Sequence, residues 1–94
     1  MRVRQRFQVV GSVQGVGYRA FVWRQAQQLD LAGWVRNCFD GSVEVVAEGS
    51  LQELDRLAEI LAAGPRMSRV ERVEARIEAA GDEPIAGFTV VGDA

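Results

Sequence analysis

Residues 11–19 (GSVQGVGYR) place two glycines and an arginine between an alternating strand pattern and the start of a helical pattern. Gly15 and Gly17 expose the backbone of this loop, and Arg19 falls in the first turn of the predicted helix. Unpaired N–H groups at the positive end of a helix dipole, next to a guanidinium, favour the binding of an anion. The types and spacing of these residues therefore point to phosphate.

The charges around this loop bear on the same hypothesis. Residues 14–29 contain no Asp or Glu but hold Arg19 and Arg24. A cation at the positive end of a helix costs a few tenths of a kcal/mol, which a bound anion would offset. The alternative is a tight turn whose glycines serve only a positive φ, with Arg19 merely exposed. A Walker ending and a GxGxxG pattern are both absent, and the residues alone leave the two interpretations open.

Asn37 is the second candidate, because it lies near the end of a predicted strand just before the turn at Asp40-Gly41. Asparagine commonly bonds its own backbone in turns, and composition alone favours that role. The functional alternative is that its amide holds a water and leaves it free to attack.

The other polar and aromatic residues are predicted to be structural. Trp23 and Trp34 are expected to be packing residues. Cys38 is expected to be a small core residue, since the chain has no histidine to activate its thiol. The remaining charged residues are expected to be solvated or outward-facing strand positions: Arg2, Arg4, Arg6, Glu44, Glu48, Glu74 and Glu78.

The inventory of side chains excludes several mechanisms. All eleven cations are arginines and there is no histidine, so imidazole catalysis, lysine Schiff bases and His-containing metal sites are excluded. A single cysteine excludes an intrachain disulfide and any CxxC motif. No metal site and no cofactor are expected.

Length and charge set the class of protein. Ninety-four residues predict one domain, 1–94, with a single small core. The net charge of −2 argues against a general nucleic-acid binder. Apolar runs are too short to span a membrane, and no signal core follows the basic N-terminus, so a cytoplasmic location is expected.

The elements that must position the candidates follow from periodicity. Alternation over residues 3–9 predicts a strand, and a helix is expected from about Tyr18 to the approach of Asp30. Strands are predicted at about 32–38, 43–47 and 73–77, with a short one around 88–90. A capping box at Ser50 and Glu53 begins a second helix that Gly64-Pro65 ends. The order β-α-β-β-α-β plus a short strand predicts an α+β, ferredoxin-like sandwich with an antiparallel sheet and both helices on one face.

Three segments together resemble the acylphosphatase family: residues 11–19 (GSVQGVGYR), 33–37 (GWVRN) and 40–43 (DGSV). The separation of the blocks, the length and the element order agree as well, so the resemblance covers essentially the whole chain. It implies hydrolysis of the carboxyl-phosphate bond of a small-molecule acyl phosphate to a carboxylate and inorganic phosphate, without metal or covalent intermediate.

The resemblance also implies roles for individual residues. Arg19 and Asn37 are expected to be catalytic: Arg19 binds the phosphoryl group, and Asn37 orients the attacking water. The loop residues Gln14, Gly15, Val16, Gly17 and Tyr18 are expected to complete the phosphate site. A monomer without nucleic-acid or membrane partners is expected. The alternatives are a non-catalytic module that binds an anion, RNA or a protein, and a part of a carbamoyl-phosphate-processing assembly.

Overall fold

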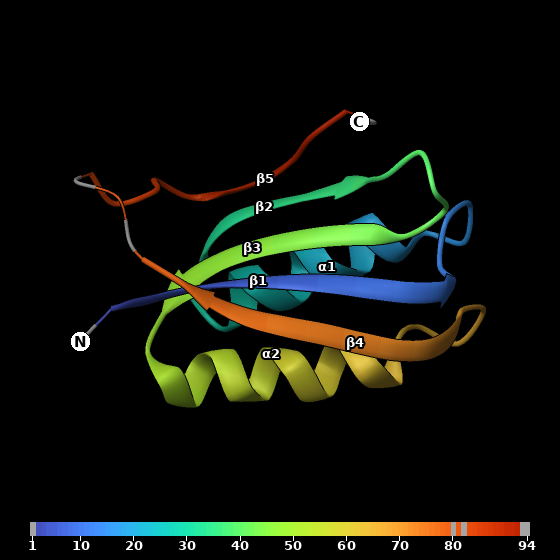
Figure 1. The fold of residues 1–94 in the computed structure, drawn as a ribbon, viewed down its shortest axis with the longest axis horizontal. Coiled ribbons are helices and arrows are strands. Elements are labelled where there is room, and N and C mark those ends of the chain that lie inside the picture. The colour runs from blue at the N-terminus through green and yellow to red at the C-terminus, as the bar shows by residue number, and fades with distance from the viewer. Residues whose placement is uncertain (1, 80, 82, 93–94) are drawn as a thin grey trace.

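The computed structural model describes residues 2–79, 81 and 83–92. Its elements are β1 (Val3–Ser12), α1 (Tyr18–Gln28), β2 (Ala32–Asn37), β3 (Val43–Gly49), α2 (Leu51–Ala63), β4 (Arg69–Glu78) and β5 (Phe88–Val90) (Figure 1). The element order expected from periodicity is confirmed. Neither helix in the described part of the chain has the length and apolarity needed to cross a bilayer.

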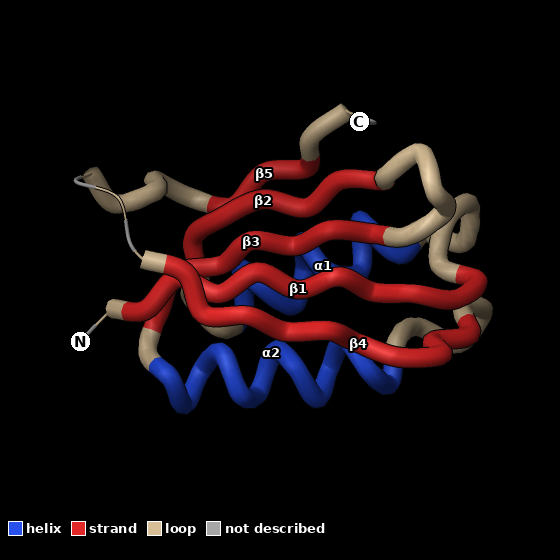
Figure 2. Tube along the Cα trace, in the orientation of Figure 1, coloured by secondary structure: helices blue, strands red, loops and turns tan. Residues whose placement is uncertain are grey.

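The five strands form one sheet in the order β4-β1-β3-β2-β5 (Figure 2). β1 pairs antiparallel with β3 and β4, and β2 pairs antiparallel with β3. The short β5 adds to β2 in parallel. The four long strands thus have the expected antiparallel, ferredoxin-like arrangement, and β5 extends the sheet at the β2 edge.

Both helices cover the same face of the sheet. α1 packs against β2 and β5, α2 packs against β4, β1 and β3, and the helices contact each other. Their apolar stripes share one core with alternate residues of the central strands, including the fully buried Phe7 opposite Val45 and Val9 opposite Val43. Alternation on the strands and helical spacing on the helices therefore meet in one core.

Helix α2 begins as the sequence predicts. The Ser50 hydroxyl accepts from the Glu53 amide at 3.2 Å, and the Glu53 carboxylate accepts from the Ser50 amide at 3.2 Å. This reciprocal capping box satisfies two helix-terminal donors. The C-cap is Gly64, with φ 66°, so the expected helix end is also confirmed.

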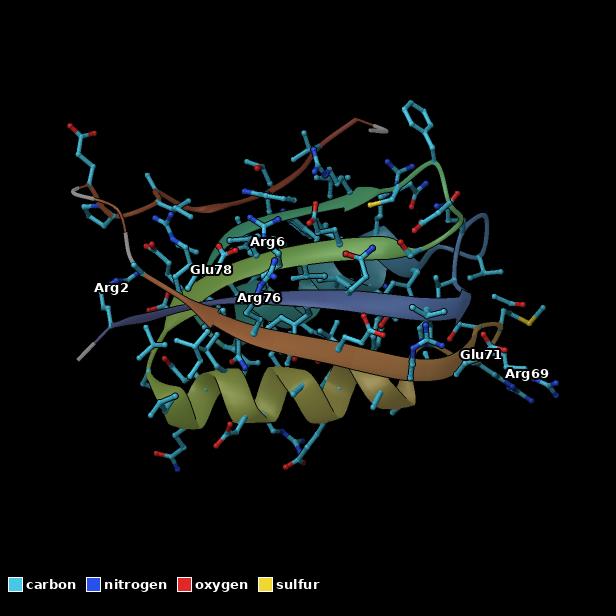
Figure 3. All side chains as sticks on the ribbon, viewed as in Figure 1. Arg2, Arg6, Arg69, Glu71, Arg76 and Glu78 are labelled. Carbon is cyan, nitrogen blue, oxygen red and sulfur yellow. The ribbon has the colours of Figure 1, made fainter. Side chains whose placement is uncertain are left out.

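The opposite face of the sheet carries charges that the sequence analysis assigned to solvent, and for the acids at its centre that prediction was wrong. Glu48 and Glu44 are buried. Arg4 of β1 pairs with Glu48, and Arg6 of β1 bridges Glu44 at 2.5 Å and Glu78 at 2.6 Å. Arg6 and Glu78 lie close together on this face in Figure 3. Carboxylates with paired cations can be buried between neighbouring strands, which alternation alone does not reveal.

The two tryptophans differ in their surroundings. Trp34 lies on the charged face beneath the guanidinium groups of Arg6 and Arg36, at 5.7 and 5.0 Å from its ring centroid. Trp23 is 41% exposed, so its expected packing role is only partly met. Its Nε1–H donates to the Phe88 carbonyl oxygen at 3.1 Å, which holds the ring beside β5.

Candidate active site

The loop between β1 and α1 lies at the same end of the molecule as the β2–β3 hairpin (Figure 1). Between them is an open pocket of about 270 Å³. Three separated segments and the loop contribute its lining residues, which are Val13, Gly15, Gly17, Tyr18, Arg19, Ala20, Asn37 and Val90. The two residues expected to be catalytic, Arg19 and Asn37, therefore line one pocket.

The N-terminus of α1 opens into this pocket. Gly17 is the N-cap residue, no side chain among the described residues caps this end, and the first turn has no acidic residue. In the first intrahelical hydrogen bond of α1, the Phe21 amide donates to the Gly17 carbonyl oxygen at 3.0 Å. The amides of Gly15, Val16 and Gly17 have no acceptor within the described part of the chain. Donors of this kind, at the positive end of a helix, suit an anion.

The glycines are required by backbone conformation rather than by space. Gly15 has φ 76° and Gly17 has φ 78°, both in the left-handed region that side chains disfavour. A Cβ at either position would meet no atom within 4 Å. The loop thus turns sharply while its backbone stays open toward the pocket.

Tyr18 anchors the start of the helix in the core. Its ring is buried, and its hydroxyl donates to the Leu61 carbonyl oxygen of α2 at 2.7 Å. Burial raises the pKa of the Tyr18 phenol well above its ordinary value, so the group stays neutral. Tyr18 is thus both a lining residue of the pocket and a fixed anchor for the start of α1.

Arg19 supplies the positive charge. It follows Tyr18 in the first turn, is half-buried, and its Nη1 donates to the Val91 carbonyl oxygen at 3.3 Å. That contact brings the chain just beyond β5 next to the guanidinium. Arg19 is the one charged side chain among the described lining residues, which include no Asp or Glu. It therefore contributes a cation to this lining.

Asn37 is the last residue of β2 and lies opposite Val43 of β3. It shares a side of the sheet with Val35, two residues earlier, which faces the helices. Its side-chain amide has no hydrogen-bond partner within the described residues. The turn role that composition favoured is taken instead by Asp40, whose carboxylate accepts from the Ser42 amide at 2.9 Å. The Asn37 amide is thus available to a molecule in the pocket.

Two of the expected phosphate-site residues, Gln14 and Val16, do not line the pocket. Val16 packs against the hydrophobic core. The Gln14 side chain points to the hairpin, where Nε2 donates to the carbonyl oxygens of Cys38 at 2.7 Å and Ser42 at 2.8 Å. The sequence predicts Gln14 only as part of the phosphate site, because local spacing does not show which distant carbonyl groups a side chain reaches.

Val90 and Ala20 were not singled out from the sequence, yet both line the pocket. Ala20 was within reach of sequence reasoning, since it follows Arg19 in the same helical turn. Val90 comes from β5 and reaches the pocket only because β5 pairs in parallel with β2. No local pattern around residue 90 signals that placement.

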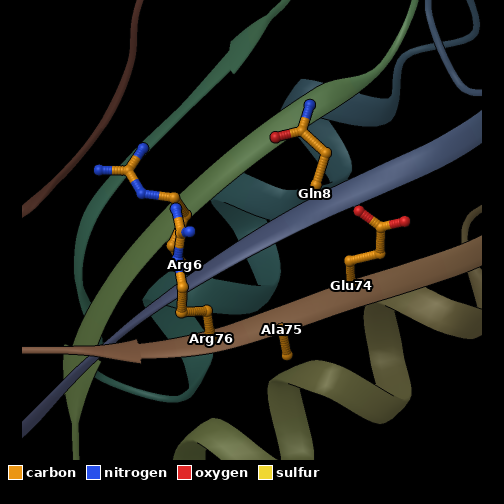
Figure 4. Close-up of a pocket in the computed structure, with 5 residues that line it drawn as sticks. All are labelled: Arg6, Gln8, Glu74, Ala75 and Arg76. Atoms are coloured by element: carbon orange, nitrogen blue, oxygen red, sulfur yellow. The ribbon is translucent and has the colours of Figure 1, made fainter.

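A second pocket, of about 210 Å³, lies over β1 and β4 on the charged face of the sheet (Figure 4). Arg6, Gln8, Glu74, Ala75 and Arg76 line it. The carboxylates of Glu44 and Glu78 already engage the Arg6 guanidinium, and no helix N-terminus opens here. Arg76 and the Gln8 amide are donors in this lining, but Glu74 lies among them, and the pocket has no open backbone amides at a helix start like those of the first pocket.

Comparison with known proteins places the chain among enzymes of one kind. The family model described as acylphosphatase matches residues 5–90. An acylphosphatase of Bifidobacterium longum (strain NCC 2705) is 48% identical over 88 residues, covering 94% of this chain and 91% of the relative. The crystal structure of acylphosphatase from Bacillus subtilis has a TM-score of 0.89 and 36% identity, covering 95% of this chain and 98% of that one. A structure of full-length HypF in a phosphate- and nucleotide-bound form aligns with 99% of this chain, at a TM-score of 0.90 and 26% identity, but only 12% of HypF is covered.

Proposed function

Since this chain belongs to the acylphosphatase family, we propose that Arg19 and the loop amides bind the phosphoryl group of an acyl phosphate while Asn37 orients the attacking water. The enzyme is a hydrolase that splits the carboxyl-phosphate bond to a carboxylate and inorganic phosphate. The observation that carries the assignment of residues is the shared pocket: Arg19, Asn37 and the open N-terminus of α1 line the same space.

The phosphoryl group fits the electropositive end of this pocket. The Gly15 and Gly17 backbone and the first turn of α1 present N–H donors, and Arg19 adds a planar fork that suits two phosphate oxygens. These donors are fixed by the fold before substrate arrives. Charge that develops on the equatorial oxygens during transfer is therefore stabilised without reorganisation.

Water attack is assigned to Asn37. Its side-chain amide can hold a water by one hydrogen bond and direct the oxygen at phosphorus. As the new P–O bond forms, the bond from phosphorus to the acyl oxygen breaks and the carboxylate leaves with its electron pair. The proton of the water passes to a phosphoryl oxygen of the substrate, because the described lining residues include no side-chain base. Positioning and charge stabilisation carry the reaction.

No strong acid catalyst is needed for this leaving group. A carboxylate is a weak base, with an ordinary pKa of about 4, so it departs without protonation. The pocket offers a guanidinium, an amide and backbone groups, which suffice for the proposed steps. We therefore propose that the reaction requires neither metal nor cofactor.

We further propose that residues 1–94 form a single domain and that the protein is monomeric, cytoplasmic and without nucleic-acid partners. The net charge of −2 supports the last of these, because nucleic-acid-binding surfaces are usually basic.

The alternative of a part in a carbamoyl-phosphate-processing assembly has limited support. HypF contains a segment similar to almost the whole of this chain, so the same fold occurs within a much longer protein. The higher identity and the near-complete coverage of the Bifidobacterium relative favour acylphosphatase activity over a part in such an assembly.

The test is an assay of benzoyl phosphate hydrolysis after treatment with a chelator, with Arg19→Gln compared with the wild type. We expect the wild type to stay fully active in EDTA. Arg19→Gln should lose nearly all turnover and should bind inorganic phosphate, measured as a competitive inhibitor, at least tenfold more weakly.

Arg24→Gln is the matched control, because this arginine lies on the same helix beyond the pocket lining. Arg24→Gln should leave the turnover and the affinity for inorganic phosphate near the wild-type values. Equal phosphate affinity in Arg19→Gln and wild type would refute the proposed phosphate site. Loss of activity in EDTA that added metal restores would refute the metal-independent mechanism.

A further inference from the structure

An apolar groove continues from the phosphate pocket along α1 and β5. Its volume is about 450 Å³, and its lining residues are Ala20, Trp23, Phe88, Thr89 and Val90. Ala20 and Val90 also line the phosphate pocket, so the two hollows meet at these residues. None of these described lining residues carries a charge.

The groove runs in a defined direction from the phosphate site. Trp23 lies four residues after Arg19 and three after Ala20, so all three share one side of α1. At a rise of about 1.5 Å per residue, the Cα atom of Trp23 lies about 6 Å beyond that of Arg19 along the helix axis. A group that leaves the phosphate site along the helix therefore meets the Trp23 ring next.

The Trp23 indole, at the end of the groove away from Arg19, is held in place but remains exposed. Its Nε1–H donates to the Phe88 carbonyl oxygen at 3.1 Å, yet the residue is 41% exposed, and Val90 beside it is 48% exposed. Trp34 provides a contrast within the same chain, since two guanidinium groups lie over its ring. An oriented aromatic face left open next to an anion site offers a surface for an apolar group.

We propose that this groove binds the acyl side of the substrate, so that the enzyme favours acyl phosphates with an aromatic or other bulky apolar acyl group. The inference rests on the proposed function, because it takes the phosphoryl group to lie at Arg19 and the loop. From that position the carboxyl carbon lies at Ala20 and Val90, where the two hollows meet. An attached ring extends to Trp23, whereas the methyl group of acetyl phosphate ends before it.

The first experiment compares kcat/KM for benzoyl phosphate and acetyl phosphate in wild type, Trp23→Ala and Trp23→Phe. Trp23→Ala removes the ring and should reduce the preference for benzoyl over acetyl phosphate about tenfold, as expected for loss of one large apolar contact. Trp23→Phe loses the indole hydrogen bond but retains an aromatic face, so it should keep most of the preference. Trp34→Ala, which removes the other tryptophan, should leave the preference unchanged.

A second experiment measures binding without turnover. In a Trp34→Phe background Trp23 is the remaining tryptophan, and benzylphosphonate should change its fluorescence whereas methylphosphonate should not. Benzylphosphonate should also inhibit wild type more strongly than methylphosphonate, and Trp23→Ala should lose that difference.

The proposal that the groove binds the acyl group would be overturned if Trp23→Ala left the ratio of kcat/KM for benzoyl and acetyl phosphate unchanged. An equal change of this ratio in Trp34→Ala would overturn it as well. These results are separable from failure of the proposed function, which shows itself in the phosphate affinity of Arg19→Gln. A lost benzoyl preference in Trp23→Ala, with phosphate inhibition unchanged, would support the groove.

Discussion

The side-chain amide of Gln14 donates to the carbonyl oxygen of Cys38 at 2.7 Å and so joins the loop after β1 to the residue that follows Asn37. A second bond, to the Ser42 carbonyl at 2.8 Å, reaches the other strand of the same hairpin. The glycine loop and Asn37 belong to different segments of the chain. We propose that Gln14 sets the distance between them.

Replacement of Gln14 by Leu should disturb this alignment. We expect kcat to fall by at least tenfold, because small displacements of reacting groups are costly, with a smaller change in phosphate inhibition. Loss of two hydrogen bonds should also lower the free energy of unfolding by about 1–2 kcal/mol. Gln8→Leu is the matched control: Gln8 bonds Ser42 from the outer face of the sheet and does not touch the loop. Equal kcat in Gln14→Leu and Gln8→Leu would show that the bridge has no positioning role.

Replacement of Asn37 by Ala should separate catalysis from binding. The variant keeps Arg19 and the loop amides, so its phosphate inhibition constant should stay within about threefold of wild type. Without a group to hold the water, kcat should fall by about a hundredfold or more. Steady-state kinetics with phosphate as inhibitor measure both quantities. A variant that loses phosphate affinity as strongly as it loses turnover would contradict the assignment of the water to Asn37.

Replacement of Gly17 by Ala should distort the loop through its backbone. An alanine at φ 78° has space but is strained, by about 1 kcal/mol. We expect weaker phosphate inhibition and a similar loss of stability, measured by urea unfolding.

Gly41→Ala controls for the strain itself, since Gly41 has φ 94°, also has open space around it, and does not line the pocket. It should lose comparable stability but keep the phosphate affinity of the wild type. If Gly17→Ala retains full phosphate affinity at equal stability loss, the loop backbone does not bind phosphate.

The buried carboxylate of Glu48 should make stability depend on pH. Burial alone would raise its pKa, but the Ile85 amide at 3.0 Å and the Arg4 guanidinium at 2.7 Å outweigh burial and hold the pKa below the ordinary value of 4.5. A depressed folded pKa stabilises the protein above pH 4.5, and that stabilisation is lost as the pH falls through the folded value.

We therefore expect Glu48→Gln to lower the free energy of unfolding at neutral pH by about 2 kcal/mol, with the difference from wild type shrinking in acid. Urea unfolding from neutral pH down to about pH 3 measures this. Glu74→Gln is the exposed counterpart, since Glu74 and its partner Arg72 are each about 60% exposed, and it should change stability little. If the difference in free energy of unfolding between wild type and Glu48→Gln does not vary with pH, titration of Glu48 is not the cause of that difference.

Much of the fold followed from local patterns in the sequence. Two-residue alternation identified the strands, helical spacing identified α1 and α2, and Ser50, Glu53 and Gly64 marked the ends of α2. Each of these signals depends on neighbours within a few residues, where backbone geometry fixes which side chains share a face. The glycine loop and the acid-free first turn of α1 could be identified from the sequence for the same reason.

Tertiary structure alone decided which distant residues meet. Arg19, Asn37 and Val90 come from α1, β2 and β5, and they share a pocket because of the strand order β4-β1-β3-β2-β5. The partners of Gln14 and the burial of Glu48 beneath Arg4 likewise depend on pairing between segments far apart in the chain. Side-chain periodicity tells which face a residue occupies, but not what lies opposite it. The sequence by itself therefore predicted a ferredoxin-like fold with a glycine loop before an acid-free helix start, and the tertiary structure brought that loop, the Asn37 amide and the Trp23 groove together.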